Sequence, residues 1–153
     1  MKVEKVLGKR GPVHSIHPEN NVCEAARLMI EKRIGALIVL DKNGEIKGIV
    51  TERDVLRRCA IKNDDLQCAY IREVMTPKEK LITATKDQNL RALMNCMTEN
   101  NIRHIPIVEG DKILDLLSIR DIVKIVLQEV EFAHKQIVDY MDTTNMEIDR
   151  IYG

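Results

Sequence analysis

The chain has 153 residues, enough for one compact domain with its own hydrophobic core. Its 24 lysine and arginine residues balance 24 aspartate and glutamate residues, and aromatic residues make up only 3% of the chain. This composition excludes the basic patch and base-stacking surface of a nucleic-acid-binding protein, and no stretch approaches the roughly 18 apolar residues of a membrane span.

The first half of the chain predicts a strand, a helix, two strands joined by a turn, and a second helix. The first helix shows apolar residues at i, i+3, i+4, i+7 and i+8 from Val22, which form one helical face. The continuous apolar run from Ile34 to Leu40 is typical of a strand covered on both faces. We expect these elements at residues 13–16, 22–30, 34–40, 45–50 and 51–58.

The second half repeats this order after a connecting segment at residues 59–73. A shift of 68 residues places Val22 on Leu90 and Ile34 on Ile102, and the shift drops to 67 after a shorter turn. The repeated elements are expected at residues 81–84, 90–97, 102–108, 113–117 and from 118 onward. Such a repeat predicts two copies of one unit packed about a pseudo-twofold axis.

The last predicted helix continues far beyond the second repeat. Its apolar positions step by four and three residues, which is typical of a heptad-like seam on an otherwise charged helix. The seam could fold back on its own chain, but we favour dimerisation, because an amphipathic extension needs a partner to bury it. The seam consists of Val126, Val130, Ala133, Ile137, Met141, Thr144, Ile148 and Ile151.

One short motif occurs once in each repeat, at the change from strand to helix. The first copy is Gly48-Ile-Val-Thr-Glu-Arg-Asp54 and the second is Asp115-Leu-Leu-Ser-Ile-Arg-Asp121. Each places a hydroxyl residue and an aspartate three positions apart at the start of a helix. This spacing is also that of a helix-capping box, and the two roles are compatible when no ligand is bound.

The tandem motifs and the strand–helix–strand–turn–strand order resemble a pair of cystathionine-β-synthase (CBS) domains, a Bateman module. The resemblance covers roughly residues 5–127 and is closest to small stand-alone CBS-pair proteins. It implies an α/β (α+β) fold of two pseudo-twofold-related β-α-β-β-α units with packed sheets, followed here by an extended C-terminal helix. The expected boundaries are 1–72 for the first unit with its lead-in and linker, 73–127 for the second unit, and 128–153 for the helical extension.

The resemblance also implies a regulatory protein that binds AMP, ADP or ATP, or else NAD or S-adenosylmethionine, in clefts between its units. The chemistry of the motif agrees, because a carboxylate can accept both hydroxyls of a ribose and a helix start attracts phosphate. The expected nucleotide-binding residues are His14, Ile16, Ile34, Gly35, Ala36, Thr51, Arg53, Asp54, Thr76, Ile82, Arg103, His104, Ile105, Pro106, Ser118, Arg120 and Asp121.

Asp115 departs from the family pattern, which has glycine at this position. Its side chain could narrow the second cleft or face the solvent, and a carboxylate near a phosphate would repel it. Both predicted clefts are therefore kept, since the first has the intact motif and the second has more phosphate donors, namely Arg103, His104 and Arg120.

The sequence gives little support to other functions. His14 and His17 make a poor metal pair, and no catalytic or glycine-rich nucleotide motif is recognisable, so we expect no enzyme, no metal and no catalytic cofactor. The alternatives to a nucleotide sensor are a dimeric interaction scaffold without a ligand and a regulator of redox partners. In the favoured interpretation the ligand shifts a homodimer or acts on a protein partner that the sequence does not identify.

The four cysteines, Cys23, Cys59, Cys68 and Cys96, form no C-x-x-C pair. They predict reduced thiols, because the chain is too long and too aliphatic for a disulfide scaffold. The N-terminal residues contain no signal-peptide core. We expect a cytoplasmic protein, or one of an organellar matrix after removal of a transit peptide.

Overall fold

The computed structural model describes residues 1–8, 11–61 and 69–152. Part of the predicted connecting segment, including Cys68, lies outside these ranges. The chain divides into two compact units, Met1–Leu117 and Ser118–Gly153. The first unit contains both sheets, and the second is the C-terminal helix.

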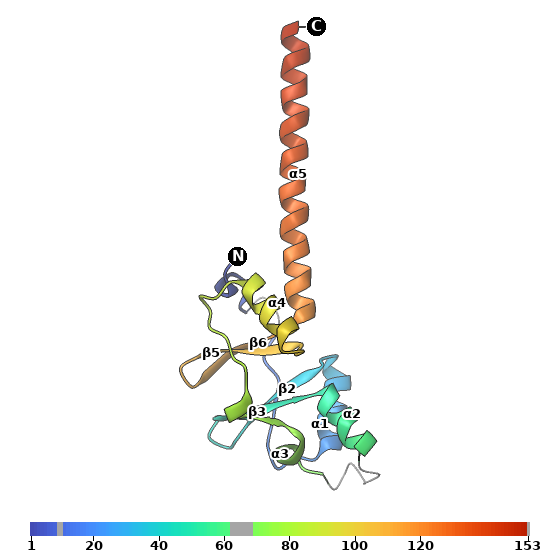
Figure 1. The fold of residues 1–153 in the computed structure, drawn as a ribbon, viewed down its shortest axis with the longest axis vertical. Helices are drawn as coiled ribbons and strands as arrows, with labels where there is room; N and C mark the ends of the chain where they lie inside the picture. Colours follow the sequence, from blue (N-terminus) through green and yellow to red (C-terminus); the bar gives the residue numbers. More distant parts are fainter. Residues whose placement is uncertain (9–10, 62–68, 153) are drawn as a thin grey trace. The chain divides into compact units, whose positions relative to one another are not determined.

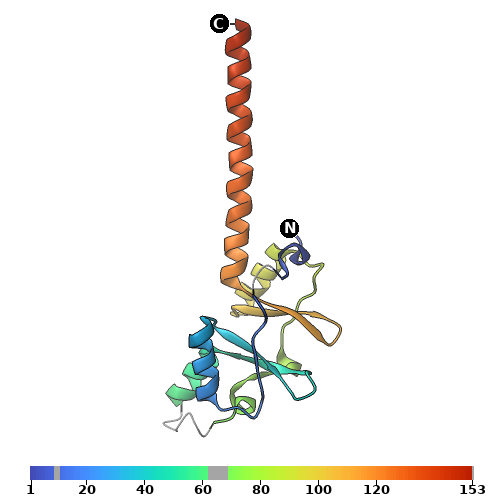
Figure 2. The ribbon, with the colours of Figure 1, turned by 180° about the vertical axis from the view of Figure 1, so that it is seen from behind.

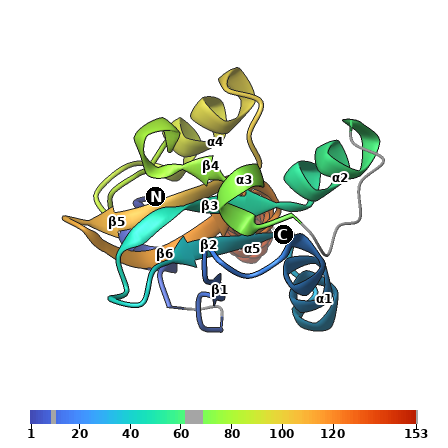
Figure 3. The same cartoon turned by 90° about the horizontal axis from the view of Figure 1, so that it is seen from below.

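The first repeat has the predicted order of elements and forms most of a four-stranded sheet (Figures 1 and 3). The strands follow the order β1-β2-β3-β4, with β1 parallel to β2 and the other neighbours antiparallel. Strand β1 is shorter than the predicted 13–16, although the His14 carbonyl also accepts a hydrogen bond from the Ile38 N–H. The elements are β1 (Ser15–Ile16), α1 (Val22–Lys32), β2 (Ala36–Leu40), β3 (Ile46–Thr51) and α2 (Glu52–Ile61).

The second repeat contains α4 (Leu90–Glu99), β5 (His104–Glu109) and β6 (Lys112–Ser118), and β5 and β6 form a two-stranded sheet. The prediction of a strand at residues 81–84 is wrong. Only Ala84 pairs, in an isolated parallel bridge to Ile107 that matches the Ile16–Val39 pair of the first repeat. Neighbouring N–H groups bond locally instead: that of Leu81 to the Lys78 carbonyl and that of Thr85 to the Gln88 side chain.

Four short elements lie outside the sequence prediction. Two of them, 3₁₀ helix η1 (Val3–Val6) and helix α3 (Ile71–Val74), are themselves related by the shift of 68 residues. Strand β4 (Thr76–Pro77) adds an edge to the sheet beside β3, and 3₁₀ helix η3 (Lys78–Lys80) follows it directly.

The segments that contain η1 and α3 form two arms, residues 1–6 and 69–74, that bind the starts of helices. The arms are exchanged between the repeats, because each one binds a helix of the other repeat. The 69–72 arm binds the start of α1, where the Val22, Ile71 and Arg72 N–H groups donate to the carbonyls of Ala69, Asn20 and Pro18. The N-terminal arm binds the start of α4 through the equivalent three bonds, which join Leu90 to Met1, Val3 to Gln88 and Glu4 to Lys86. Thus the arm at the beginning of the chain completes the second repeat, and the arm between the repeats completes the first.

The core of the first repeat lies between its sheet and its helices. Strand β2 is buried on both faces, as its continuous apolar run predicts. Leu37 and Val39 belong to the cluster formed with α1, while Ile38 and its register partner Ile49 are buried on the other face of the sheet. The core is aliphatic, as expected. Its cluster comprises Ile16, Val22, Ala25, Met29, Leu37, Val39, Val50, Ala69 and Ile71.

The C-terminal unit is a single helix, α5 (Ile119–Tyr152), of 34 residues (Figures 1 and 2). The predicted extension is therefore helical and contains no internal turn. Most of the apolar side chains along the predicted seam are exposed, including Val130, Ile137 and Met141. The side chain of Ile148 is outside the described part. Within the described ranges, no helix has the length and apolar character needed to cross a bilayer.

The capping box of α1 predicts a pH dependence of stability. The Glu24 carboxylate accepts hydrogen bonds from the Asn20 side chain and the Asn21 N–H, and these lower the pKa of Glu24. A carboxylate whose pKa is lowered in the folded protein stabilises the fold at pH values above its ordinary pKa. This contribution is lost as the pH falls through the lowered pKa, because the carboxylate is then protonated. We expect Glu24→Gln to unfold at lower urea concentration than the wild type at about pH 7, with the gap narrowing as the pH falls toward about 3. An equal gap at both pH values would contradict this assignment.

Candidate functional site

The first motif lies where β3 ends and α2 begins, beside the start of β2. Ala36 and Thr51 are register partners in the sheet, and the Glu52 N–H donates to the Gly35 carbonyl over 3.0 Å. The end of the buried β2–β3 pair therefore holds the first turn of α2 against the segment that leads into β2.

Thr51 and Asp54 cap helix α2 reciprocally. The Asp54 Oδ2 atom accepts hydrogen bonds from the Thr51 N–H at 2.8 Å and from the Thr51 hydroxyl at 2.9 Å, and the Asp54 N–H donates to Oγ1 of Thr51 at 3.4 Å. Ser118 and Asp121 make the same three bonds at the start of α5. The capping function anticipated for the motif is thus confirmed in both copies.

This cap uses only one oxygen of Asp54. Among the described residues, its Oδ1 atom has no hydrogen-bond partner, and the side chain is only partly buried. A carboxylate oxygen in this position can accept hydrogen bonds from a ligand without breaking the cap. The arrangement therefore combines a structural role and an available acceptor in one side chain.

The second repeat contributes to the surroundings of this motif. The Arg53 guanidinium donates from Nη1 to the Asn101 carbonyl at 2.9 Å. A Cβ atom placed on Gly35 would lie 3.1 Å from Oε2 of Glu52 and 3.3 Å from Cε1 of His104. The absence of a side chain at Gly35 therefore gives Glu52 and His104 the room to lie close to its backbone.

Sequence reasoning missed Asn101 and Glu52 at this site. Asn101 has a left-handed φ of 53° after α4, as Arg33 has a φ of 55° after α1, and the two positions are 68 residues apart. The repeat shift, together with the tolerance of asparagine for this conformation, was the signal that could have singled out Asn101. The approach of Glu52 to Gly35 depends on the contact between the β3–α2 junction and the segment before β2, for which the sequence carries no local signal.

The other predicted site residues differ in their exposure. Those with buried side chains are Ile16, Ala36, Ile105 and Pro106, while Arg103 and Arg120 are exposed. The partly buried set is His14, Ile34, Thr51, Arg53, Asp54, Thr76, Ile82, His104, Ser118 and Asp121. His104 was expected in the second cleft, and the structure places it beside Gly35 of the first repeat. Ser118, Arg120 and Asp121 belong to the C-terminal unit, so the second cleft stays a prediction.

Asp115 is 6% exposed, and the alternative that it faces the solvent is wrong. Its Oδ1 atom accepts a hydrogen bond from the Leu116 N–H at 2.7 Å. In the first repeat the equivalent Gly48 leaves room for β4, because a Cβ there would lie 2.3 Å from the Thr76 carbonyl oxygen. The glycine of the first motif is thus required by its neighbouring strand.

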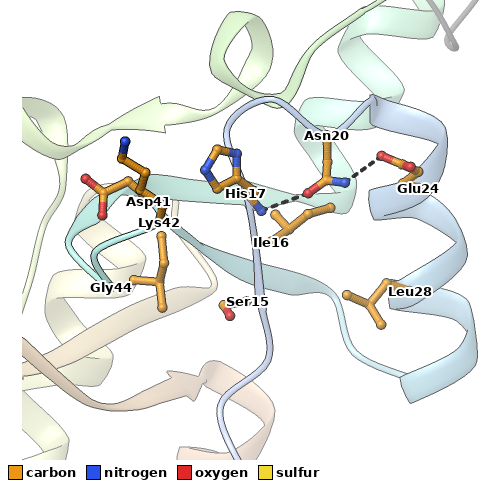
Figure 4. Close-up of a pocket in the computed structure, with 10 residues that line it drawn as sticks. Ser15, Ile16, His17, Asn20, Glu24, Leu28, Asp41, Lys42 and Gly44 are labelled. Carbon is orange, nitrogen blue, oxygen red and sulfur yellow. Dashed lines mark hydrogen bonds between the residues drawn. The ribbon is translucent and has the colours of Figure 1, made fainter.

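A separate open pocket of about 590 Å³ lies between β1, α1 and the β2–β3 turn (Figure 4). Its polar groups mostly bond to each other or to nearby main chain: Asn20 joins the His17 N–H to Glu24, and Asp41 caps the turn. The hydrogen bond from the Glu45 N–H lowers the pKa of Asp41.

Among the expected nucleotide-binding residues, only Ile16 lines this pocket. The full lining is Ser15, Ile16, His17, Asn20, Glu24, Leu28, Leu40, Asp41, Lys42 and Gly44.

The structure thus contains two copies of one strand–helix unit, and each copy has a hydroxyl–aspartate cap after its last strand. The two copies contact one another beside the Thr51–Asp54 cap, through the hydrogen bond from Arg53 to Asn101. These features define a tandem-repeat module. The CBS-domain family model matches residues 3–61 and 71–128. The chain therefore belongs to the CBS-domain family and carries two CBS domains.

Three relatives illustrate the similarity. The mitochondrial CBS domain-containing protein CBSX3 of Arabidopsis thaliana is 35% identical over 114 residues, which span 72% of this chain and 55% of that protein. A solved CBS-domain protein of Burkholderia ambifaria is 33% identical with a TM-score of 0.78, covering 84% of this chain and 95% of that one. The CBS pair of the protein MJ0100, solved with 5′-methylthioadenosine and S-adenosyl-L-methionine, is 25% identical with a TM-score of 0.73, covering 84% and 98%.

Proposed function

We propose that this chain is a regulatory module that binds an adenine nucleotide or a related adenosine compound at the Thr51–Asp54 motif. Asp54 accepts the ribose hydroxyls through its unused Oδ1 atom, and the Arg53 guanidinium, at the positive end of the α2 dipole, donates its remaining N–H groups to a phosphate. The observation that carries the proposal is the Asp54 carboxylate, which caps the helix with one oxygen and leaves the other without a partner among the described residues. The adenosine ligands bound to MJ0100 support the same class of ligand.

The regulatory step is a shift between arrangements of the two repeats. Arg53 and Gly35 of the first repeat contact Asn101 and His104 of the second, so a ligand at this motif touches both. It favours one arrangement to the extent that it binds that arrangement more tightly. The readout is a homodimer or a protein partner, and no step of catalysis is assigned to the chain.

The compartment we propose is one with reduced thiols, either the cytoplasm or an organellar matrix. Cys23, Cys59 and Cys96 are free thiols, and the Arabidopsis relative is named as mitochondrial. A thiol-based response to redox partners is the weaker alternative, because the cysteines form no C-x-x-C pair.

Asp54→Asn tests the ligand site directly. Unfolding temperatures are measured with AMP, ADP, ATP, NAD and S-adenosylmethionine, each against a control without ligand. A ligand at 100 times its dissociation constant should stabilise the wild type by about 2.7 kcal/mol. The amide of Asp54→Asn retains an oxygen for the cap but presents an N–H group to the ribose, so we expect the affinity to fall by roughly a hundredfold.

Glu73→Gln is the matched control, since Glu73 caps the Tyr70 N–H at 2.8 Å in the same way but lies outside the motif. Its ligand response should equal that of the wild type. A response that survives Asp54→Asn but is lost in Asp121→Asn would move the ligand to the second motif. No response to any of the five ligands, in protein freed of co-purified nucleotide, would favour a scaffold without a ligand.

A further inference from the structure

Helix α5 carries most of the large apolar side chains that are exposed among the described residues. Of the fifteen large apolar side chains that are exposed, ten lie on this helix. Val130 is 61% exposed, Ile137 59% and Met141 59%. Exposed apolar side chains along a helix of 34 residues favour a partner that covers them, because packing of an apolar face supplies most of the stability of a helix. The ten are Val123, Leu127, Val130, Phe132, Ile137, Val138, Tyr140, Met141, Met146 and Ile151.

The spacing of the stripe is symmetric about Ile137. Toward the N-terminus the apolar positions follow at steps of 4, 3, 4 and 3 residues, and toward the C-terminus they follow at the same steps. Each of these apolar positions on the N-terminal side of Ile137 therefore has an apolar or small counterpart at the same distance on the C-terminal side. The positions are Val123, Val126, Val130, Ala133, Ile137, Met141, Thr144, Ile148 and Ile151, and we call this set the α5 seam.

We propose that the α5 seam binds the same helix of a second copy of this chain, antiparallel to it, with the twofold axis at Ile137. In this arrangement every seam position of one helix lies opposite a seam position of the other. The two successive steps of four around Ile137 depart from the seven-residue repeat only at the position of the proposed axis, where such a step unwinds the supercoil locally.

Side-chain size supports the antiparallel orientation. The twofold axis places the small Ala133 opposite Met141 of the second copy, so that a small residue meets a long one in each of two layers. A parallel pair would instead set Ala133 against Ala133 and Met141 against Met141, which leaves one layer empty and crowds the other.

Charge supports the same orientation. Residues 119–136 carry three basic and three acidic side chains, whereas residues 138–152 carry four acidic side chains and only Arg150 as a basic one. A parallel pair would bring the two acidic halves together. The antiparallel pair sets each acidic half beside a neutral one and near the positive end of the partner helix dipole.

The first test is the mass of the full-length protein in solution, measured by light scattering or sedimentation. Ile137→Glu places two carboxylates against each other at the twofold axis, so we expect the dissociation constant to rise by roughly a hundredfold or more. Phe132→Glu is the matched control, because Phe132 is 65% exposed but lies off the seam, and it should leave the mass unchanged. Circular dichroism checks that both variants keep their helices.

The second test is the orientation of the pair, in a chain whose four native cysteines are changed to serine. Val130→Cys and Thr144→Cys chains, mixed and oxidised, should form a disulfide with each other, because positions 130 and 144 are equally distant from Ile137. Val130→Cys alone should not cross-link.

Three results would overturn the proposal. They are a wild-type monomer at micromolar concentration, a mass that Ile137→Glu does not change, or efficient cross-linking of Val130→Cys to itself. The first two would leave another segment or another protein as the partner of the seam. None of these measurements involves a nucleotide, so they stand or fall independently of the ligand site.

Discussion

Gly48→Val should lower the free energy of unfolding by about 3 kcal/mol, at the upper end of the usual cost of overpacking. A Cβ atom on Gly48 would lie 2.3 Å from the Thr76 carbonyl oxygen and 3.1 Å from the Met75 sulfur. The Thr76 carbonyl belongs to the main chain of β4 and cannot move away as a flexible side chain would. The variant must therefore displace β4 from β3. Urea unfolding followed by circular dichroism measures the change.

Gly11→Val is the matched control for this substitution. No atom lies within 4 Å of a Cβ built on Gly11, and its backbone has no left-handed φ. We expect its free energy of unfolding to stay within about 0.5 kcal/mol of the wild type. If both valine variants were equally destabilised, the cost would come from the loss of glycine itself and not from the approach of β4.

Leu37→Ala should destabilise the protein by about 3–4 kcal/mol, since it removes three carbon atoms from a fully buried side chain and leaves a cavity. Leu37 lies on the central strand β2, within the cluster that joins the sheet to α1. Chemical unfolding at several denaturant concentrations gives the free energy, and an unchanged m-value would show that the unfolded state is unaffected.

Leu56→Ala is the corresponding substitution on the surface of α2, where the side chain is 67% exposed. Its cost should be within about 0.5 kcal/mol, because little buried area is lost. A large cost at Leu56 would indicate that this side chain is covered by a partner under the conditions of the measurement.

The sequence predicted the elements whose burial follows a regular period. The helices predicted from Val22 and Leu90 begin at those residues, and the buried strand predicted at 34–40 is found at Ala36–Leu40. A regular hydrophobic period predicts each of these elements, because each packs one face or run of apolar residues into the core. The capping role of the two hydroxyl–aspartate pairs was also readable, since it depends only on residues three positions apart.

Features that depend on distant contacts were not predictable in this way. Thr76 and Pro77 show no strand pattern, and they pair with β3 only because Gly48 leaves room for them. The burial of Asp115 and the approach of His104 to Gly35 depend on how chain segments far apart in sequence pack, which no local period records. For the same reason, the second cleft remains a prediction.

The exchanged arms constrain the order in which the protein can fold during its synthesis. Residues 1–6 leave the ribosome before their hydrogen-bond partners at residues 86–90, which follow about 80 residues later, and at ~5–20 residues per second this interval is roughly 4–16 s. Val3 and Val6, which are buried in the finished protein, stay uncovered during this interval. The first repeat can close as soon as residues 69–74 emerge, whereas the second must bind residues 1–6, which were synthesised before the first repeat. A bulky fusion at the N-terminus should therefore delay the second repeat and leave the first unaffected.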